Sequence, residues 1–285
     1  MHANRKPRDD EIDVYGLTHQ GHVRKDNQDQ FLLATVNKRF NILYSSLPES
    51  ARLPLPDERV AFLAMVADGV GGGVGGKKAS ATALEVATEY VTTSSAVFLE
   101  ADSGDQEFIQ TLQSAALKSH EAVRARAAIE AEGRAMATTL TLYMGIWPYY
   151  YILQVGDSRY YLYREGTLTQ ISRDQTIAQD LVDKGVLTRA VAERSRFADV
   201  LSSAIGADEA MPVVTRLRSE WGVTHLLCSD GLTKHVTDER IAEVLRTKTS
   251  ARQAAEQLLQ EALDGGGTDN VTIIVGGTRE KGPPD

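Results

Sequence analysis

The chain has very little cysteine, few histidines and no long apolar run. Its 285 residues include a single cysteine, Cys228, which excludes an internal disulfide framework and fits a reducing compartment. The six histidines lack the spacing of a zinc site. The longest uncharged stretch, residues 135–154, contains Pro148 and many β-branched or aromatic residues, so it predicts strands and not a membrane span.

Positive charge is also scarce. The chain has 31 Lys and Arg against 39 Asp and Glu, a formal net charge of −8. Because contacts to nucleic-acid phosphates need clustered Lys and Arg, we expect no nucleic-acid partner, although a small phosphorylated group can bind at a metal-filled site. The N-terminus, MHANRKPRDDEID, has no apolar core, so we expect no secretory signal, no membrane association and a cytoplasmic location.

Hydrophobic periodicity predicts strands in groups and helices in pairs. The expected strands cover 12–18, 30–36, 60–67, 213–218, 223–228 and 271–275, with several more in 138–171. The expected helices cover 77–92, 106–132, 174–184, 188–194 and 238–263, the last with a break near 249–250. Without regular βαβ alternation, this order predicts an α+β domain of antiparallel sheet and helix layers.

The domain is expected to span residues 11–278, between a flexible N-terminal tail at 1–10 and a C-terminal tail at 279–285. Residues 37–58 contain three prolines, which predicts a surface insertion within a hairpin. No internal repeat or convincing linker divides the chain, so it is predicted to form one domain.

The stretch from Val60 to Tyr90 is an apolar strand, a glycine-rich turn and an alanine-rich helix. Gly71, Gly76 and Lys77 fit the phosphate-binding pattern GxxxxGK of nucleotide hydrolases. The next residue, Lys78, stands where that pattern needs a Ser or Thr for magnesium. A nucleotide-binding loop is therefore one interpretation, with a missing ligand.

Three other interpretations of the same turn stay open. Gly71, Gly73 and Gly76 fit the dinucleotide pattern GxGxxG, but such matches arise easily among crowded glycines. Asp68 followed by Gly69 can be a metal-binding carboxylate beside exposed backbone. A flexible surface loop without any ligand is the alternative that needs no function.

Four aspartates stand where an apolar strand meets a glycine-bearing turn: Asp68, Asp157, Asp230 and Asp269. Each alone is best explained as a turn residue, since Asp caps its own backbone. Four in one chain favour a shared site, where their mutual repulsion would be relieved by a cation. Oxygen ligands suit Mg²⁺ or Mn²⁺, and a pair of such ions can activate water for attack on phosphorus. The pattern thus indicates hydrolysis of a phosphate ester.

At this point the chain resembles a known family, the metal-dependent serine/threonine protein phosphatases of type 2C in their compact bacterial form. The resemblance covers residues 12–276 and rests on six motifs in order. They are Arg24 with Asn27-Gln28-Asp29, Asp68-Gly69-Val70-Gly71-Gly72, Gly156-Asp157-Ser158-Arg159, Arg173-Asp174, Ser229-Asp230-Gly231-Leu232 and Gly267-Thr268-Asp269-Asn270. The implied fold is a central sandwich of two antiparallel sheets flanked by helix pairs, four layers in all.

The resemblance also implies a role for each matching residue. Asp68 would bridge two Mn²⁺ or Mg²⁺ ions, the Gly69 carbonyl would bind one of them, and Asp230 and Asp269 would complete the ligands of the other. Asp174 would help Asp230 hold a third, looser ion. Arg24 would clamp the substrate phosphate, for which its planar guanidinium is suited, and Asp29 would hydrogen-bond metal-bound water. Arg24, Asp29, Asp68 and Asp230 are the expected catalytic residues.

The chain departs from the family at two positions. Gln28 stands where many members carry a Glu metal ligand; its amide oxygen can coordinate but brings no charge. Val70 stands where eukaryotic members carry a His proposed as general acid, which leaves that role unassigned. Residues 188–210 resemble the family's mobile flap beside the site. Asp157 and Arg159 are expected to pair with each other and stiffen a turn.

The resulting hypothesis is a phosphatase acting in bacterial signalling on phosphoserine and phosphothreonine in proteins. Its expected partners are phosphoproteins, among them a Ser/Thr kinase and its substrates, and a monomer is expected. A P-loop nucleotide hydrolase is the rival enzyme, and Lys78 and the absent βαβ rhythm count against it. A catalytically dead relative that only binds is the third hypothesis, and Gln28 leaves room for it.

Overall fold

The protein is described by a computed structural model covering residues 5–39, 57–70, 74–94, 105–130 and 136–278. Most of the proline-rich insertion lies outside these residues, as do Gly71 and Gly73 of the glycine turn, residues 1–4 of the expected N-terminal tail and the whole of the expected C-terminal tail. The boundaries expected at residues 10 and 278 stay predictions.

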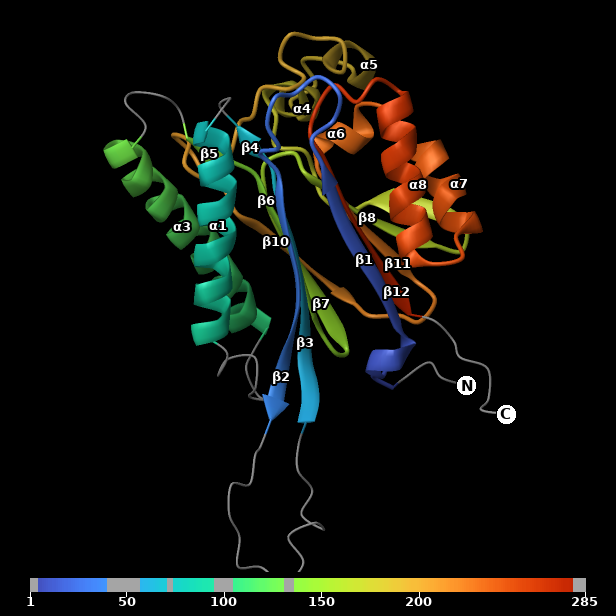
Figure 1. Cartoon of the computed structure of the whole chain (residues 1–285). Helices are drawn as coiled ribbons and strands as arrows, with labels where there is room; N and C mark the ends of the chain where they lie inside the picture. The colour runs from blue at the N-terminus through green and yellow to red at the C-terminus, as the bar shows by residue number, and fades with distance from the viewer. Residues whose placement is uncertain (1–4, 40–56, 71–73, 95–104, 131–135, 279–285) are drawn as a thin grey trace, which may run out of the picture.

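Two five-stranded antiparallel sheets form the centre of the molecule (Figure 1). The first sheet has the order β1 (Ile12–His19), β12 (Val271–Thr278), β11 (Thr224–Cys228), β8 (Arg159–Arg164) and β9 (Thr167–Gln170). The second has the order β10 (Val213–Arg218), β7 (Tyr149–Val155), β6 (Leu140–Ile146), β3 (Asp57–Ala67) and β2 (Gln30–Arg39). Every strand pair in both sheets is antiparallel, which excludes the doubly wound nucleotide folds.

Helix pairs cover the outer faces of the sandwich. Helices α1 (Val74–Thr93) and α3 (Asp105–Glu130) pack on the second sheet, and α7 (Asp238–Thr247) and α8 (Ala251–Asp264) on the first (Figure 1). Three apolar clusters fill the spaces between the four layers, the middle one between the two sheets. Cys228 is buried in the cluster beneath α7 and α8, as expected of a core residue. The predicted four-layer α+β architecture is confirmed.

Short elements gather at one end of the sandwich (Figure 1). They are β4 (Gly69–Val70) paired with β5 (Ala137–Thr138), and the helices α4 (Ile177–Asp183), α5 (Arg189–Ala192) and α6 (Asp230–Thr233). The helix expected over 174–184 begins only at Ile177 because Thr176 caps it, its hydroxyl accepting from the Gln179 amide at 3.2 Å. The helix expected over 188–194 is likewise shorter, at Arg189–Ala192.

The N-terminal segment makes defined contacts at the opposite end of the sandwich. A 3₁₀ turn, η1 (Asp9–Glu11), leads into β1. Arg5 pairs with the buried Glu11 and stacks over the Trp221 ring at 4.8 Å. Lys6 donates to the Arg59 carbonyl and, at 2.7 Å, to Glu58. This segment therefore joins β1 to strand β3.

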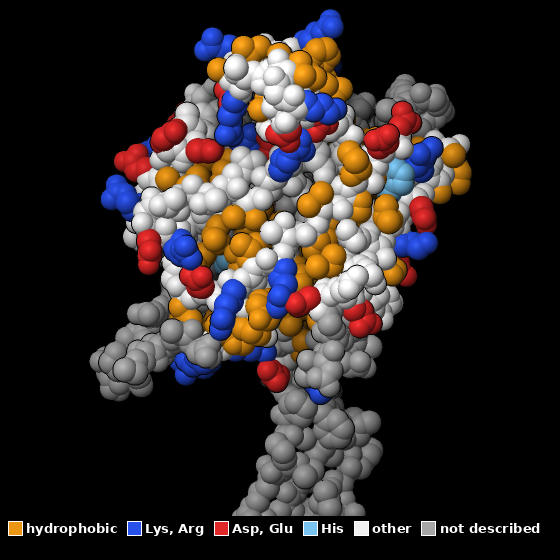
Figure 2. Space-filling view, turned by 180° about the vertical axis from the view of Figure 1, so that it is seen from behind, with side chains coloured by type: hydrophobic (Ala, Val, Ile, Leu, Met, Phe, Trp, Pro, Cys, Tyr) orange, Lys and Arg blue, Asp and Glu red, His pale blue; other side chains and the backbone are white. Residues whose placement is uncertain are grey.

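The surface seen from behind in Figure 2 carries acidic and basic side chains interspersed, with apolar side chains gathered near its middle. Among the described residues, no helix is long and apolar enough to cross a membrane.

Candidate metal centre

Three of the aspartates singled out by the sequence lie on strand ends at the same end of the sandwich. Asp68 follows β3, Asp230 begins α6 directly after β11, and Asp269 precedes β12. Antiparallel order brings these ends together because β12 enters the sheet where β11 leaves it. A cavity of about 170 Å³ lies between them. Its lining comprises Arg24, Gln28, Asp68, Gly69, Val70, Asp157, Asp199, Leu201, Asp230, Lys234, Asp269 and Asn270.

Glycines allow the loops that carry these acids to approach one another. A Cβ on Gly231 would lie 1.9 Å from the Asn270 carbonyl oxygen, and one on Gly21 would lie 2.2 Å from that of Asp269. Asn270 fastens the same loops: its Oδ1 accepts from the Gln28 amide at 2.9 Å, and its Nδ2 donates to the Gln20 carbonyl at 2.8 Å. The ends of β11 and β12 are thereby held against the segment before β2.

Asp29 is the most enclosed acid of the group. Its Oδ2 accepts from the hydroxyls of Ser229 and Thr272, each at 2.7 Å. Its Oδ1 is buried and has no partner among the described residues. Burial raises the pKa of Asp29, and these two hydrogen bonds offset only part of that effect.

Asp68 and Asp230 share this electrostatic environment. Burial raises the pKa of Asp68, and the charges of Asp29 and Asp230 raise it further. Burial also raises the pKa of Asp230, against the opposing effect of Lys234. Asp230 Oδ1 is a second buried carboxylate oxygen without a partner among the described residues.

Two basic side chains lie among the acids. Lys234 Nζ is 2.6 Å from Asp230 Oδ2 and 2.8 Å from Asp269 Oδ2. Arg24 contacts both oxygens of Asp269, with its Nε 2.7 Å from Oδ1 and its Nη2 2.8 Å from Oδ2. Burial would raise the pKa of Asp269, but hydrogen bonds from Arg24 and Lys234 outweigh it and lower that pKa.

A second cavity, of about 230 Å³, adjoins the first and shares Asp157, Asp199, Asp230 and Lys234 with it. Asp174 lines it but is held by Arg159, whose Nη2 is 2.7 Å from Asp174 Oδ2 and whose Nε is 3.0 Å from Oδ1. The expected pairing of Asp157 with Arg159 is therefore wrong: Arg159 points to Asp174, since that carboxylate accepts its planar group in two places.

Asp157 instead belongs to the acidic group. Burial raises its pKa first, and the charges of Asp230 and Asp174 add to this. In the sequence, Asp157 is one of the four strand-end acids, but it was expected to stiffen a turn and not to take part in the site. Asp199 and Lys234 were missed altogether, although the spacing of Lys234 four residues after Asp230 was a usable signal.

Gln28 is buried beside the cavity, with its amide oxygen directed at the start of α1. A Cβ on Gly76 would lie 2.1 Å from Gln28 Oε1, so only a glycine leaves room for this approach. Gly69, predicted to offer its carbonyl, lines the cavity next to Asp68. The structure thus brings Arg24, Gln28, Asp29, Asp68, Gly69, Asp230 and Asp269 together and places Asp174 in the adjoining cavity.

The donor chemistry of this group fits a hard divalent cation. The donors are oxygens, two of the buried carboxylate oxygens have no partner, and like charges raise one another's pKa values. Within the described part of the chain, no three acidic, histidine or cysteine side chains stand ready as a metal-binding group. The Lys234 ammonium already occupies the space between two of the acids.

Comparison with known proteins agrees with this chemistry. Residues 56–265 match the sequence model of the family described as protein phosphatase 2C. The serine/threonine protein phosphatase PstP of Mycobacterium tuberculosis is 36% identical over 215 residues, which is 75% of this chain but 40% of the length of PstP. The chain thus spans less than half of that relative.

Solved structures of bacterial serine/threonine phosphatases also match this chain. The crystal structure of the M. tuberculosis phosphatase PstP/Ppp matches with a TM-score of 0.73 at 29% identity, covering 94% of this chain and 99% of that one. The catalytic domain of PstP in complex with two manganese ions matches with a TM-score of 0.71, also at 29% identity and with the same coverage of both chains.

Proposed function

The chain belongs to the protein phosphatase 2C family, and from this premise we propose that it is a metal-dependent phosphatase that hydrolyses phosphoserine and phosphothreonine in proteins. One observation carries the proposal. Asp29, Asp68, Asp230 and Asp269 converge from separate strand ends, and two of their buried carboxylate oxygens have no partner among the described residues. Burying so many acids together is costly unless a cation neutralises them.

Asp68, Asp230, Asp269 and the Gly69 carbonyl would hold two divalent cations, Mn²⁺ or Mg²⁺, with Asp157 and Asp174 beside a third. The bound ions would supply the acidity that activates water and the positive charge that neutralises the phosphate. Manganese is supported by the two ions in the PstP catalytic domain. Gln28 would contribute, at most, an uncharged oxygen.

The chain's own side chains orient the reactants. Asp29 is fixed by Ser229 and Thr272, so that Oδ1 is left to accept a hydrogen bond from the attacking water. The Arg24 side chain is half exposed at the cavity, where its guanidinium would bind the phosphate of the substrate after leaving Asp269. The exposed residues Arg189, at the start of α5, and Glu193, directly after it, line the adjoining cavity and would contact residues flanking the phosphorylated one.

The substrates are proposed to be phosphoproteins, among them a Ser/Thr kinase and the proteins that it phosphorylates, and the chain is proposed to act as a monomer. The name of PstP supports the substrate class.

The test is hydrolysis of a phosphothreonine peptide with Mn²⁺ and with chelator. Asp230→Asn removes a charge from the proposed ligand set, and Asp264→Asn, at the exposed end of α8, is the matched control. We expect release of phosphate only with metal, a loss of about 10²–10³-fold in Asp230→Asn and none in Asp264→Asn. Equal rates in chelator and in Mn²⁺ would remove the mechanism, and binding of the peptide without hydrolysis would favour a dead relative.

A further inference from the structure

Lys234 has an unusual position in the proposed centre. It directly follows α6, one turn after Asp230, and its backbone amide donates to the Asp230 carbonyl at 2.9 Å. Its ammonium lies 2.6 Å from Asp230 Oδ2 and 2.8 Å from Asp269 Oδ2. The side chain lines both cavities of the site. A cation of the chain itself therefore bridges two carboxylates that arrive from different strands.

These contacts engage the oxygens that a metal would need. Asp269 is fully engaged, because Lys234 and Arg24 Nη2 contact Oδ2 while Arg24 Nε and the Asn270 amide contact Oδ1. Asp230 keeps only Oδ1 free. A divalent ion held by both carboxylates therefore competes for these oxygens with Arg24, which contacts Asp269, and with Lys234, which contacts both acids.

The Lys234 ammonium and a divalent ion compete for the same acids because their positive charges repel each other. The Lys234 ammonium also lies near Asp157, whose pKa it lowers against the effect of burial. In its place a divalent ion brings two positive charges to the same acids, but both cations together would repel each other across a short distance in a partly buried site. Occupancy by one cation thus weakens binding of the other.

We propose that Lys234 is an internal competitor for the metal, so that binding of a divalent cation by Asp230 and Asp269 is coupled to release of the Lys234 ammonium. This inference rests on the proposed function, because it concerns the same ligands. It predicts that the metal-free protein is stabilised by Lys234 and that its metal affinity is lowered by the same contact.

Calorimetric titration of the full chain with Mn²⁺ tests this, combined with thermal unfolding in chelator and in Mn²⁺. Lys234→Met keeps a long unbranched side chain and removes the charge. Lys234→Arg keeps the charge, and Lys118→Met is a matched control at an exposed Lys paired with Glu121 on α3. We expect Lys234→Met to bind Mn²⁺ at least about tenfold more tightly than the wild type. The free energy of a tenfold change in affinity is small compared with the repulsion between two cations at such close range. Its metal-free melting temperature should fall and its rise on adding Mn²⁺ should grow.

Lys234→Arg and Lys118→Met should both bind Mn²⁺ like the wild type. Equal or weaker binding by Lys234→Met would overturn the inference while leaving the proposed function intact. Absence of Mn²⁺ binding by the wild type and by Lys234→Met would overturn both. If Lys234→Met does not fold without metal, Lys234→Gln replaces it with the same expectation, because it also lacks the charge.

Discussion

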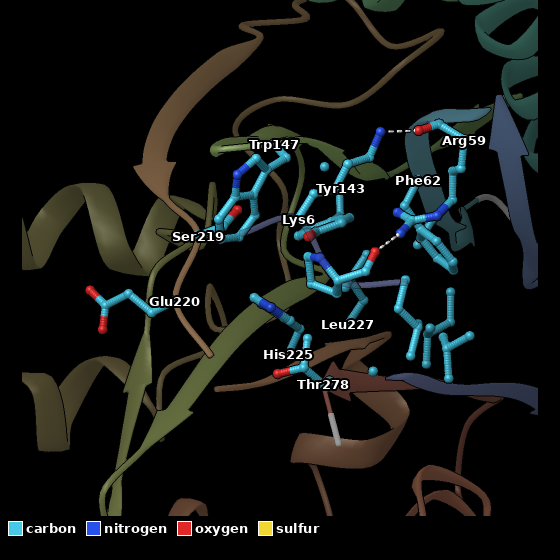
Figure 3. Close-up of a pocket in the computed structure, with 18 residues that line it drawn as sticks. Lys6, Arg59, Phe62, Tyr143, Trp147, Ser219, Glu220, His225, Leu227 and Thr278 are labelled. Carbon is cyan, nitrogen blue, oxygen red and sulfur yellow. Dashed lines mark hydrogen bonds between the residues drawn. The ribbon is translucent and has the colours of Figure 1, made fainter. Parts of the chain in front are cut away.

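Titratable side chains are enclosed at both ends of the β-sandwich, but their surroundings differ. Strands β3, β11 and β12 run from one end to the other. At one end they carry Asp68, Asp230 and Asp269. At the opposite end the same strands line a cavity of about 100 Å³, shown in Figure 3, together with Tyr143 and His225.

Glycines from both sheets line the far cavity. Gly145 on β6 pairs with Phe62 and Tyr150, and Gly276 on β12 pairs with His225 and Val14. Gly145 and Gly276 both line the cavity. Lys6 and Pro7 also line it; Lys6 donates to the Arg59 carbonyl, and Arg59 Nη2 donates to the Pro7 carbonyl at 2.7 Å (Figure 3).

Burial favours the neutral form of two titratable groups at this end, His225 and Tyr143. It lowers the pKa of His225 to about 4 and raises the pKa of Tyr143. His225 Nδ1 and the Tyr160 hydroxyl form a hydrogen bond of 2.6 Å, which a neutral ring can make. A single buried group can thus avoid the free-energy cost of burying a charge by staying neutral. At the acidic end several carboxylates raise one another's pKa values, and cations relieve that repulsion.

The largest expected effect is the loss of phosphopeptide hydrolysis when a charge is removed at the acidic end. Asp68→Asn should lower phosphopeptide hydrolysis in Mn²⁺ by about 10²–10³-fold, because Asp68 is the acid proposed to hold both ions. Glu220→Gln, at the rim of the far cavity, is the control and should hydrolyse at the wild-type rate. Full activity of Asp68→Asn would show that the acidic end is only structural.

The pH dependence of the free energy of unfolding tests whether His225, at the far end, is neutral in the folded protein. Since the folded-state pKa of His225 is lowered to about 4, the unfolded chain takes up a proton first as the pH falls below about 6.5. Stability due to neutral His225 is therefore lost between about pH 6.5 and pH 4. Urea unfolding in chelator at pH 7.5 and pH 5 should show about 2 kcal/mol more loss in the wild type than in His225→Gln.

Taking the difference between these two proteins cancels the titration of the acidic end, which is common to both. Identical pH dependence in wild type and His225→Gln would contradict the assignment of a neutral buried ring.

The smallest expected effect comes from filling the far cavity. A Cβ on Gly276 would meet only Val14, at 3.4 Å and beyond, so Gly276→Ala can be accommodated. It should stabilise the protein by about 0.5 kcal/mol through the unfolded state and leave Mn²⁺ affinity unchanged. Urea unfolding and calorimetry check the two parts, and a changed Mn²⁺ affinity would show that the two ends are coupled.

The order of strands and helices predicted antiparallel sheet and helix layers, because strand and helix periods are local signals, whereas the sandwich of two sheets in four layers was implied by the family resemblance. The sequence also predicted the convergence of Asp68, Asp230 and Asp269, through the repeated motif of an acid where an apolar strand meets a glycine-bearing turn. It could not predict which side chain pairs with Arg159, because Asp157 and Asp174 are both near it along the chain and only the path of β8 and β9 decides. The position of Lys234 between two acids likewise depends on how the Asp269 loop meets α6, which no local pattern encodes.

The most direct measurement is anomalous X-ray diffraction at the manganese edge, from crystals of the full chain grown in excess Mn²⁺. We expect two strong peaks within ligand distance of Asp68, one of them also beside Asp230 and Asp269, with the Lys234 ammonium moved away. Crystals without any manganese peak among Asp68, Asp230 and Asp269, under saturating Mn²⁺, would contradict this expectation.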